Sequence, residues 1–424
     1  MLNHLSIFIK PPLKISHHFQ PAIASVYKSP LIVPFPLLMK LFHLIIAILI
    51  GLSSTILYKH RGALTDLTSV AINSIANYYN IYLKSSSEAD KAETRTLSPQ
   101  PVESNILQGT IPEPDHHLFA TEMSVARTIR KAFLAIEQAE GQGARVRRSI
   151  GTPNLRNFSP FLMLDHFSIK PGAGFPDHPH RGQETITYLI QGGVDHEDFA
   201  GNRGTLNSGD LQFMTAGRGI VHAEMPRQNP DGSANVGLQL WVDLPQQLKN
   251  CEPRYRDLRA SEIPAVDVDD GKATIKVISG QSHGVDSVKD LAYTPVWILD
   301  VILRPGAKVT QPLPQGWNAF AYILEGNAWF SNGDDRQKVE QYHNVVFEPQ
   351  GDVVHLELDA DAEQNSRIVL IAGTPLDQPI VQYGPFVVTS KEEVYQALFD
   401  YQSHANGFER AKDWESEIGK SMLT

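Results

Sequence analysis

The amino-acid sequence predicts an all-β protein built from two tandem barrels. From Met123 onward, short segments rich in β-branched and aromatic residues follow one another, bounded by Gly, Pro or Asp. This pattern is typical of sandwiches and barrels. The β-rich part also repeats, because Lys170–Gly174 (KPGAG) corresponds to Arg304–Lys308 (RPGAK), and Tyr188–Gly192 corresponds to Tyr322–Gly326. No long helical pattern separates the repeats, so we expect two barrels of similar plan.

The expected elements set the domain boundaries. The clearest strand segments are Thr185–Ile190, Leu211–Met214, Leu238–Val242, Ile275–Ile278, Val296–Leu303, Ala319–Leu324 and Ile368–Ala372. They assign residues 123–255 to a first barrel and residues 256–388 to a second. Apolar side chains recur at helical spacing within Lys391–Tyr401, and Ser390 is a suitable N-cap. Residues 389–424 are therefore expected to form a short helix and a tail.

Residues 1–122 differ in composition from the rest of the chain. Residues 41–57 are almost wholly apolar, and a helix of that length spans about 25 Å, slightly less than the ~30 Å core of a bilayer. Three explanations remain open for this apolar helix: a membrane anchor, a cleaved targeting segment, or an extension that is absent from the native protein. The polar residues that follow, about 62–122, predict a disordered linker.

Charge and cysteine content narrow the class of function. The chain holds 37 Lys and Arg residues against 47 Asp and Glu, and all of the acidic excess follows residue 122. Non-specific nucleic-acid binding needs a basic surface, so we expect no direct nucleic-acid partner. Cys251 is the single cysteine, which excludes an internal disulfide and favours a reducing compartment. The expected location is the cytoplasm and/or nucleus, with membrane anchoring or organelle targeting through residues 1–61 as the alternative.

Two short stretches offer metal-ligand side chains in pairs. His178 and His180 flank Pro179, and His222 and Glu224 follow about forty residues later. Side chains at positions i and i+2 of a strand point to the same side, so each pair presents two ligands on one face. Two such pairs facing each other inside a small barrel bring three imidazoles and one carboxylate together. That set suits a divalent ion such as Fe(II), Mn, Ni, Cu or Zn.

The second barrel repeats only half of this pattern. His355 and Glu357 occupy the places of the later pair, but Pro312–Gly316 stands where the first two histidines would recur. Two ligands without partners make a poor site, so we expect the second barrel to be structural or regulatory and to hold no metal. A lone histidine is more often a hydrogen-bonded structural residue than a ligand, and we assign no metal to the other histidines.

Several motifs together resemble the pirin family of the cupin superfamily. They are Asp177–Glu184 (DHPHRGQE), Met214–Gly219 (MTAGRG) and Val221–Pro226 (VHAEMP), and the resemblance covers about residues 123–420. It implies a two-domain cupin fold with iron in the first barrel only. The resemblance implies that the iron ligands are His178, His180, His222 and Glu224. It also implies quercetin 2,3-dioxygenase activity and, in animals, nuclear regulation of transcription factors.

Glu184 and Glu224 are the catalytic candidates. Glu224 would be the one anionic ligand. Glu184 lies four residues after His180, where the broader cupin pattern has a ligand, but on a straight strand it would lie ~13 Å away. Gly182 allows the chain to turn and bring it back. We expect Glu184 to act beside the ligands or as a catalytic base, with direct ligation as the rival role.

Two functions remain in competition. The first is ring-opening of a flavonol by O2, with Fe(II) as the expected metal and Mn, Ni, Cu, Zn or Co as alternatives. The second is a metal- or redox-dependent transcriptional co-regulator that binds protein partners without turnover. Fold alone decides neither, because one fold hosts many functions. We expect a monomer in either case.

Overall fold

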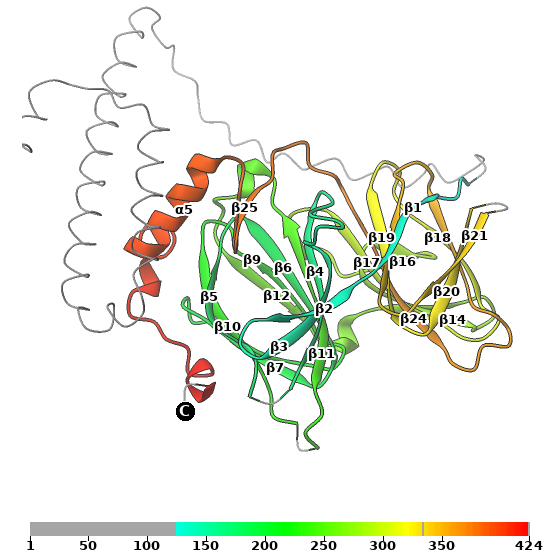
Figure 1. Cartoon of the computed structure of the whole chain (residues 1–424), viewed down its shortest axis with the longest axis horizontal. Coiled ribbons are helices and arrows are strands. Elements are labelled where there is room, and N and C mark those ends of the chain that lie inside the picture. Colours follow the sequence, from blue (N-terminus) through cyan, green and yellow to red (C-terminus); the bar gives the residue numbers. More distant parts are fainter. Residues whose placement is uncertain (1–123, 171, 230, 333–334, 423–424) are drawn as a thin grey trace, which may run out of the picture. The chain divides into compact units, whose positions relative to one another are not determined.

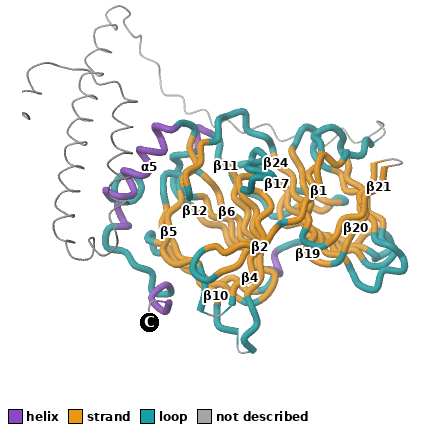
Figure 2. Tube along the Cα trace, viewed as in Figure 1, coloured by secondary structure: helices purple, strands orange, loops and turns teal. Residues whose placement is uncertain are grey.

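The computed structural model describes residues 124–170, 172–229, 231–332 and 335–422. It confirms the predicted all-β protein with two barrels and a short C-terminal helix (Figures 1 and 2). The expected apolar helix at residues 41–57 and the linker at 62–122 lie outside the described residues. Within the described part of the chain, no helix is both long and apolar enough to span a bilayer.

The first barrel combines a seven-stranded and a four-stranded sheet, and all of their strand pairs are antiparallel. The larger sheet has the order β12 (Arg254–Leu258), β9 (Leu211–Thr215), β6 (Gln183–Gln191), β11 (Asn235–Asp243), β4 (Phe161–Ile169), β3 (Ala144–Ile150) and β2 (Ile136–Glu140). The smaller sheet has the order β5 (Phe175–His180), β10 (Ile220–Pro226), β7 (Gly193–Asp198) and β8 (Arg203–Asn207).

The second barrel has the same plan. Its seven-stranded sheet has the order β1 (Ile129–Leu134), β22 (His343–Phe347), β19 (Asn318–Glu325), β24 (Ser366–Gly373), β17 (Val296–Leu303), β14 (Ala273–Ser279) and β13 (Ala265–Val268). Its four-stranded sheet has the order β18 (Lys308–Pro312), β23 (Val353–Glu357), β20 (Asn327–Asn332) and β21 (Asp335–Glu340).

The remaining elements are short. Two small ribbons pair β15 (Gln281–Ser282) with β16 (Val285–Asp286) and β25 (Val381–Tyr383) with β26 (Phe386–Val388). Helix α5 (Lys391–Ser403) begins after Ser390, whose side chain accepts a hydrogen bond from the Glu393 amide in a capping box. The 3-10 turns are η1 (Gln246–Leu248), η2 (Ala260–Glu262), η3 (Glu409–Ala411) and η4 (Gly419–Met422).

Sheet membership crosses the predicted domain boundaries at both ends. Strand β1 precedes the first barrel in sequence but pairs with β22 of the second. Arg127, from the most basic stretch of this part of the chain, is buried there and donates to the Trp317 and Pro314 carbonyls at 2.6 and 2.7 Å. After the second barrel, the chain returns to the first, where Phe386 forms a β-bridge with Arg181. The boundaries at residues 255 and 388 stay predictions.

The interiors of the two barrels differ in polarity. On β23, Val354 and Leu356 are buried in the apolar core of the second barrel. His355 and Glu357 alternate with them and are only half-buried, because neighbouring side chains on a strand point to opposite faces. The pair that echoed the metal ligands therefore lies on the outer face, where the His355 ring is 2.9 Å from the Thr310 hydroxyl.

A buried polar network joins the two barrels. The Tyr188 hydroxyl of the first barrel donates to Asp300 Oδ2 of the second at 2.7 Å. Arg367 donates to both Asp300 oxygens, at 3.0 and 2.8 Å. The Asp300 side chain is completely buried, so this ion pair is stable only because its hydrogen bonds replace those to water.

Removing the shared carboxylate should destabilise the whole molecule. In the variant Asp300→Ala, Arg367 remains buried without its partner and the Tyr188 hydroxyl loses its acceptor. We expect the free energy of unfolding to fall by about 3–5 kcal/mol, as measured by urea denaturation. The control is Glu325→Ala, because the Glu325 side chain is 61% exposed and lies 3.7 Å from the same arginine. Its loss should cost less than about 1 kcal/mol, and equal effects would contradict the role given to Asp300.

His166 makes the stability of this interface depend on pH. Its Nδ1 lies 3.2 Å from the Tyr322 hydroxyl of the other barrel, and burial, aided by Arg147 and Arg367, lowers the pKa of His166 from 6.5 to about 4. As pH falls through 6.5, His166 therefore becomes protonated in the unfolded chain before it does so in the folded one. The free energy of unfolding should fall by up to about 3 kcal/mol by pH 4. Urea denaturation should show a shallower loss between pH 6.5 and 4 for His166→Gln, and equal slopes would refute this assignment.

Candidate metal centre

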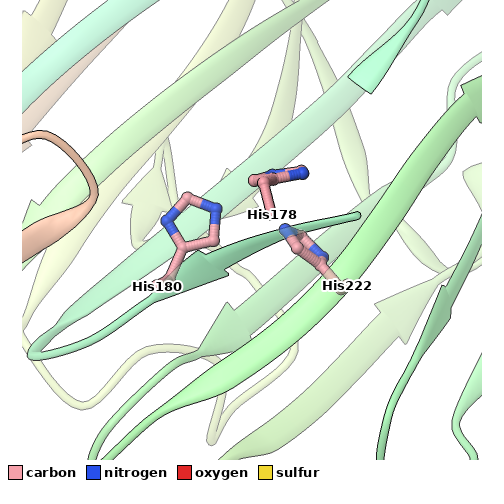
Figure 3. Close-up of side chains that lie close together, drawn as sticks. All are labelled: His178, His180 and His222. Atoms are coloured by element: carbon pink, nitrogen blue, oxygen red, sulfur yellow. The ribbon is translucent and has the colours of Figure 1, made fainter. Parts of the chain in front are cut away.

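The pairing of β5 with β10 brings three histidines together. The two strands run antiparallel with His178 directly opposite His222, and His180 opposite Ile220. One nitrogen of each imidazole lies within 4.8 Å of one nitrogen of each of the other two, and Figure 3 shows the three rings turned toward one another. Their centroids are 4.4 to 5.0 Å apart. The structure therefore brings together three of the four predicted ligands.

The surroundings of the rings favour the neutral form that binds a metal. Burial, reinforced by the neighbouring histidines, lowers the pKa of His180 and of His222 well below the usual value of 6.5. His178 Nδ1 lies 2.8 Å from the Pro176 carbonyl oxygen. Because a carbonyl only accepts, Nδ1 must carry the hydrogen, which leaves the Nε2 lone pair free for a metal.

His222 provides the test of fit for a metal. Both of its ring nitrogens are buried, and neither has a hydrogen-bond partner among the described residues. A buried polar atom without a partner costs free energy, and a metal ion bound by this ring would satisfy one of the two nitrogens. The donor set of three neutral imidazoles suits a divalent transition metal. The three histidines therefore fit a divalent transition metal.

Gln183 supports the second histidine of the cluster. Its side-chain amide lies 2.8 Å from His180 Nδ1, and its Oε1 is buried without a partner. The two ends of an amide are assigned from hydrogen bonding, and turning this amide over places Oε1 where it accepts a proton from Nδ1. His180 Nε2 is then free for a metal, as for His178. Sequence analysis missed this role, although Gln183 stands only three residues from His180.

Glu224 lies in the same cavity but outside the group of three. A bulge separates it from His222 in the pairing with β5. Its Oε1 accepts from the Thr187 hydroxyl at 3.2 Å and its Oε2 from the Gln239 amide at 3.0 Å. Thr187 and Gln239 are register partners on β6 and β11, so the larger sheet holds the carboxylate. The predicted role of Glu224 as fourth ligand stays a prediction.

Glu184, the other catalytic candidate, is buried and accepts hydrogen bonds from three donor groups. Both of its oxygens accept from the backbone amide of Tyr293, at 3.0 and 3.1 Å, and Oε2 also accepts from that of Thr294 at 3.1 Å. The Thr215 hydroxyl donates to Oε1 at 2.7 Å. Glu184 is not among the residues that line the cavity beside the histidines, and its side chain contacts the segment that leads into β17. The predicted role of Glu184 beside the ligands, as a catalytic base or as a ligand, stays a prediction.

A cavity of about 870 Å³ is lined by His178, His180 and Glu224 at the cluster. Its aromatic walls include Trp241, whose ring centroid is 5.1 Å from that of His180, and Phe175, which is 6.4 Å from His178. Arg148 and Asp165 form a buried ion pair in the wall, joined at 2.7 Å. Ile380, Val381, Gln382, Gly384 and Pro385, which follow β24, complete this part of the lining. Such a space suits a planar aromatic ligand.

Two tandem barrels, with a histidine cluster inside the first, define a two-domain cupin protein. The family model for pirin matches residues 143–242, and that for the pirin C-terminal cupin domain matches residues 298–407. The chain belongs to the pirin family, which confirms the resemblance found in its motifs.

Similar proteins agree with this assignment. Human pirin is 48% identical over 70% of this chain and 100% of its own length. A pirin-like protein of Solanum lycopersicum is 47% identical over 69% of this chain and 97% of its own. Among solved structures, a quercetin 2,3-dioxygenase from Acinetobacter baumannii is 29% identical, covers 66% of this chain and 98% of its own, and superposes with a TM-score of 0.59.

The support given by Gln183 can be tested with Co(II) as a probe. In Gln183→Leu, His180 loses the group that fixes its tautomer, and we expect Co(II) affinity to fall about 10–100-fold in a titration followed by absorbance. The matched control is Gln212→Leu, because Gln212 forms a similar buried contact of 2.9 Å with His196, outside the group of three. Equal affinities of Gln183→Leu and the wild type would contradict the assignment.

Proposed function

We propose that the protein is a metal-dependent dioxygenase that opens the ring of a flavonol-type substrate with O2. The observation that carries this proposal is the convergence of three imidazoles, of which His180 and His222 are buried and His178 is half-buried, beside a large cavity with aromatic side chains in its wall. Similarity to a solved quercetin 2,3-dioxygenase at 29% identity supports the substrate class. Fe(II) is the proposed metal, and Mn, Ni, Cu, Zn and Co are the alternatives to test.

The proposed ligands are His178, His180, His222 and Glu224. When bound, a metal would supply a Lewis acid, a template for the substrate and a route for electrons. The chain supplies the rest. Burial keeps water away from the rings of His180 and His222, and the aromatic wall orients a planar substrate.

We assign proton handling to Glu224. It is the carboxylate that lines the cavity on the strand of His222, and it is 5% exposed. A flavonol hydroxyl that enters the cavity must lose its proton to bind as an anion, and Glu224 is placed to receive it. Thr187 and Gln239 fix the orientation of the carboxylate by donating to it. Glu224 would therefore act as a general base as well as an anionic ligand.

Oxygen uptake tests the enzymatic proposal. Full-length protein loaded anaerobically with Fe(II) should hold about one ion per chain and consume O2 when quercetin is added. His178→Ala should reduce uptake to background because one of three imidazole ligands is lost. The control is His355→Ala, which removes a histidine from the outer face of the second barrel. Wild-type protein that is full of metal and consumes no O2 with quercetin would falsify the proposal.

Exposed aromatic side chains favour a second candidate function, binding to a protein partner. Tyr395 and Phe399 lie one turn apart on α5, and each is 62% exposed. Neighbouring exposed aromatics often mark interaction sites, as a transcriptional co-regulator would need. If the Fe(II) and Fe(III) forms differ in their affinity for a protein partner and neither form turns over quercetin, the co-regulator function is favoured over the enzymatic one.

A further inference from the structure

The metal-binding strand β5 has few means of holding its own position. It lies at the edge of the four-stranded sheet and pairs only with β10 there. Two of its six residues, Pro176 and Pro179, have no backbone N–H to donate. His178 and His180 nevertheless have to keep a fixed distance from His222. Some other part of the molecule must therefore hold β5 in place.

The C-terminal strap, defined here as residues 381–420, lies against this strand. It follows the second barrel, and Figure 1 shows it, from β25 through α5 to the tail, beside β5 and β10 of the first barrel. The Val387 amide donates to the Arg181 carbonyl at 3.0 Å, and the Arg181 amide to the Pro385 carbonyl at 3.2 Å. Gly182 permits this approach, because a Cβ there would collide with the Val387 carbonyl oxygen.

Arg181, directly after His180, is the main anchor of the strap. Its guanidinium donates to Asp400 Oδ2 at 2.7 Å and to the Asn406 carbonyl at 2.6 Å, and lies 4.8 Å from the centre of the Phe408 ring. The Arg181 and Asp400 side chains are only 8% and 3% exposed. A buried pair of this kind loses much more on the removal of one partner than an exposed pair does.

The strap also holds the other end of the strand. Asp177, directly before His178, accepts from the Ser416 amide at 3.1 Å. Phe408 packs against Gly219, just ahead of β10, where a Cβ would lie 2.8 Å from the ring. Both metal-binding strands are thus in contact with one segment that follows β24, and Val381, Gln382, Gly384 and Pro385 of that segment also line the cavity.

We propose that the C-terminal strap sets the geometry of the metal centre, with Arg181 and Asp400 as positioning residues that act through His178 and His180. The inference rests on the proposed metal centre. It adds that the geometry of this centre depends on the contacts between the strap and β5. Because the strap begins where the second barrel ends, it also gives that barrel a role in the site of the first. Coupling of this kind is reciprocal, so metal binding should in turn tighten the strap.

The test compares Co(II) binding by three full-length proteins. In Asp400→Asn the buried charge pair is lost while the side-chain shape is kept, and we expect Co(II) affinity to fall about 10-fold or more with a shift of the Co(II) absorption bands. The matched control is Asp300→Asn, which weakens the Arg367 pair, where the carboxylate is also buried. The control should unfold earlier than wild type but bind Co(II) with unchanged affinity and spectrum.

A second variant and a second measurement guard against simple loss of folding. Arg181→Lys keeps the charge but cannot make the same directed bonds, so it should change affinity and spectrum as Asp400→Asn does. In the wild type, Co(II) should slow hydrogen exchange of amides in residues 391–420 as well as in β5. If Co(II) protects β5 alone, or Asp400→Asn binds it like the control, the strap proposal is wrong. If the wild type binds no Co(II), the metal centre itself is wrong.

Discussion

The antiparallel pairing of β5 with β10 is the constraint on which the site depends. It sets His178 opposite His222, and the alternation of a strand places His180 on the same face. Three imidazoles from two distant stretches then meet in the barrel, and those of His180 and His222 are buried there. Burial disfavours the protonated form of an imidazole, so the same burial that forms the site lowers the pKa of His180 and of His222.

The second barrel has the equivalent antiparallel pairing of β18 with β23 but, among its described residues, no histidines facing its interior. Its interior is filled by aliphatic and aromatic side chains such as Val354, Leu356 and Phe330. The polar pair His355 and Glu357 faces outward on β23. This pair has the same spacing as His222 and Glu224, but it lies on the opposite face of its strand from the barrel interior. The first barrel therefore has a cavity beside its histidines, whereas the interior of the second is filled by apolar side chains.

The two barrels are bound into one body by segments that each contributes to the other. Strand β1 extends a sheet of the second barrel, and the C-terminal strap covers the metal-binding strands of the first. Between them, Asp300 joins Tyr188 to Arg367 in a buried network. Glu184 of the first barrel also contributes to this framework, since it accepts hydrogen bonds from the backbone amides of Tyr293 and Thr294.

Sequence by itself determined the fold class, the repeat of two barrels, the C-terminal helix with its Ser390 cap and the three histidines, because these depend on local periodicity and on spacing within one strand. Glu224 was found as a candidate for the same reason. Only the tertiary structure decided that Thr187 and Gln239 hold this carboxylate, that Gln183 supports His180, and that Arg181 is tied to Asp400. Those contacts join residues that are far apart in the chain or on different strands. Their positions depend on the register of the sheets and on the path of the C-terminal segment back to the first barrel, and neither can be predicted from a local sequence pattern.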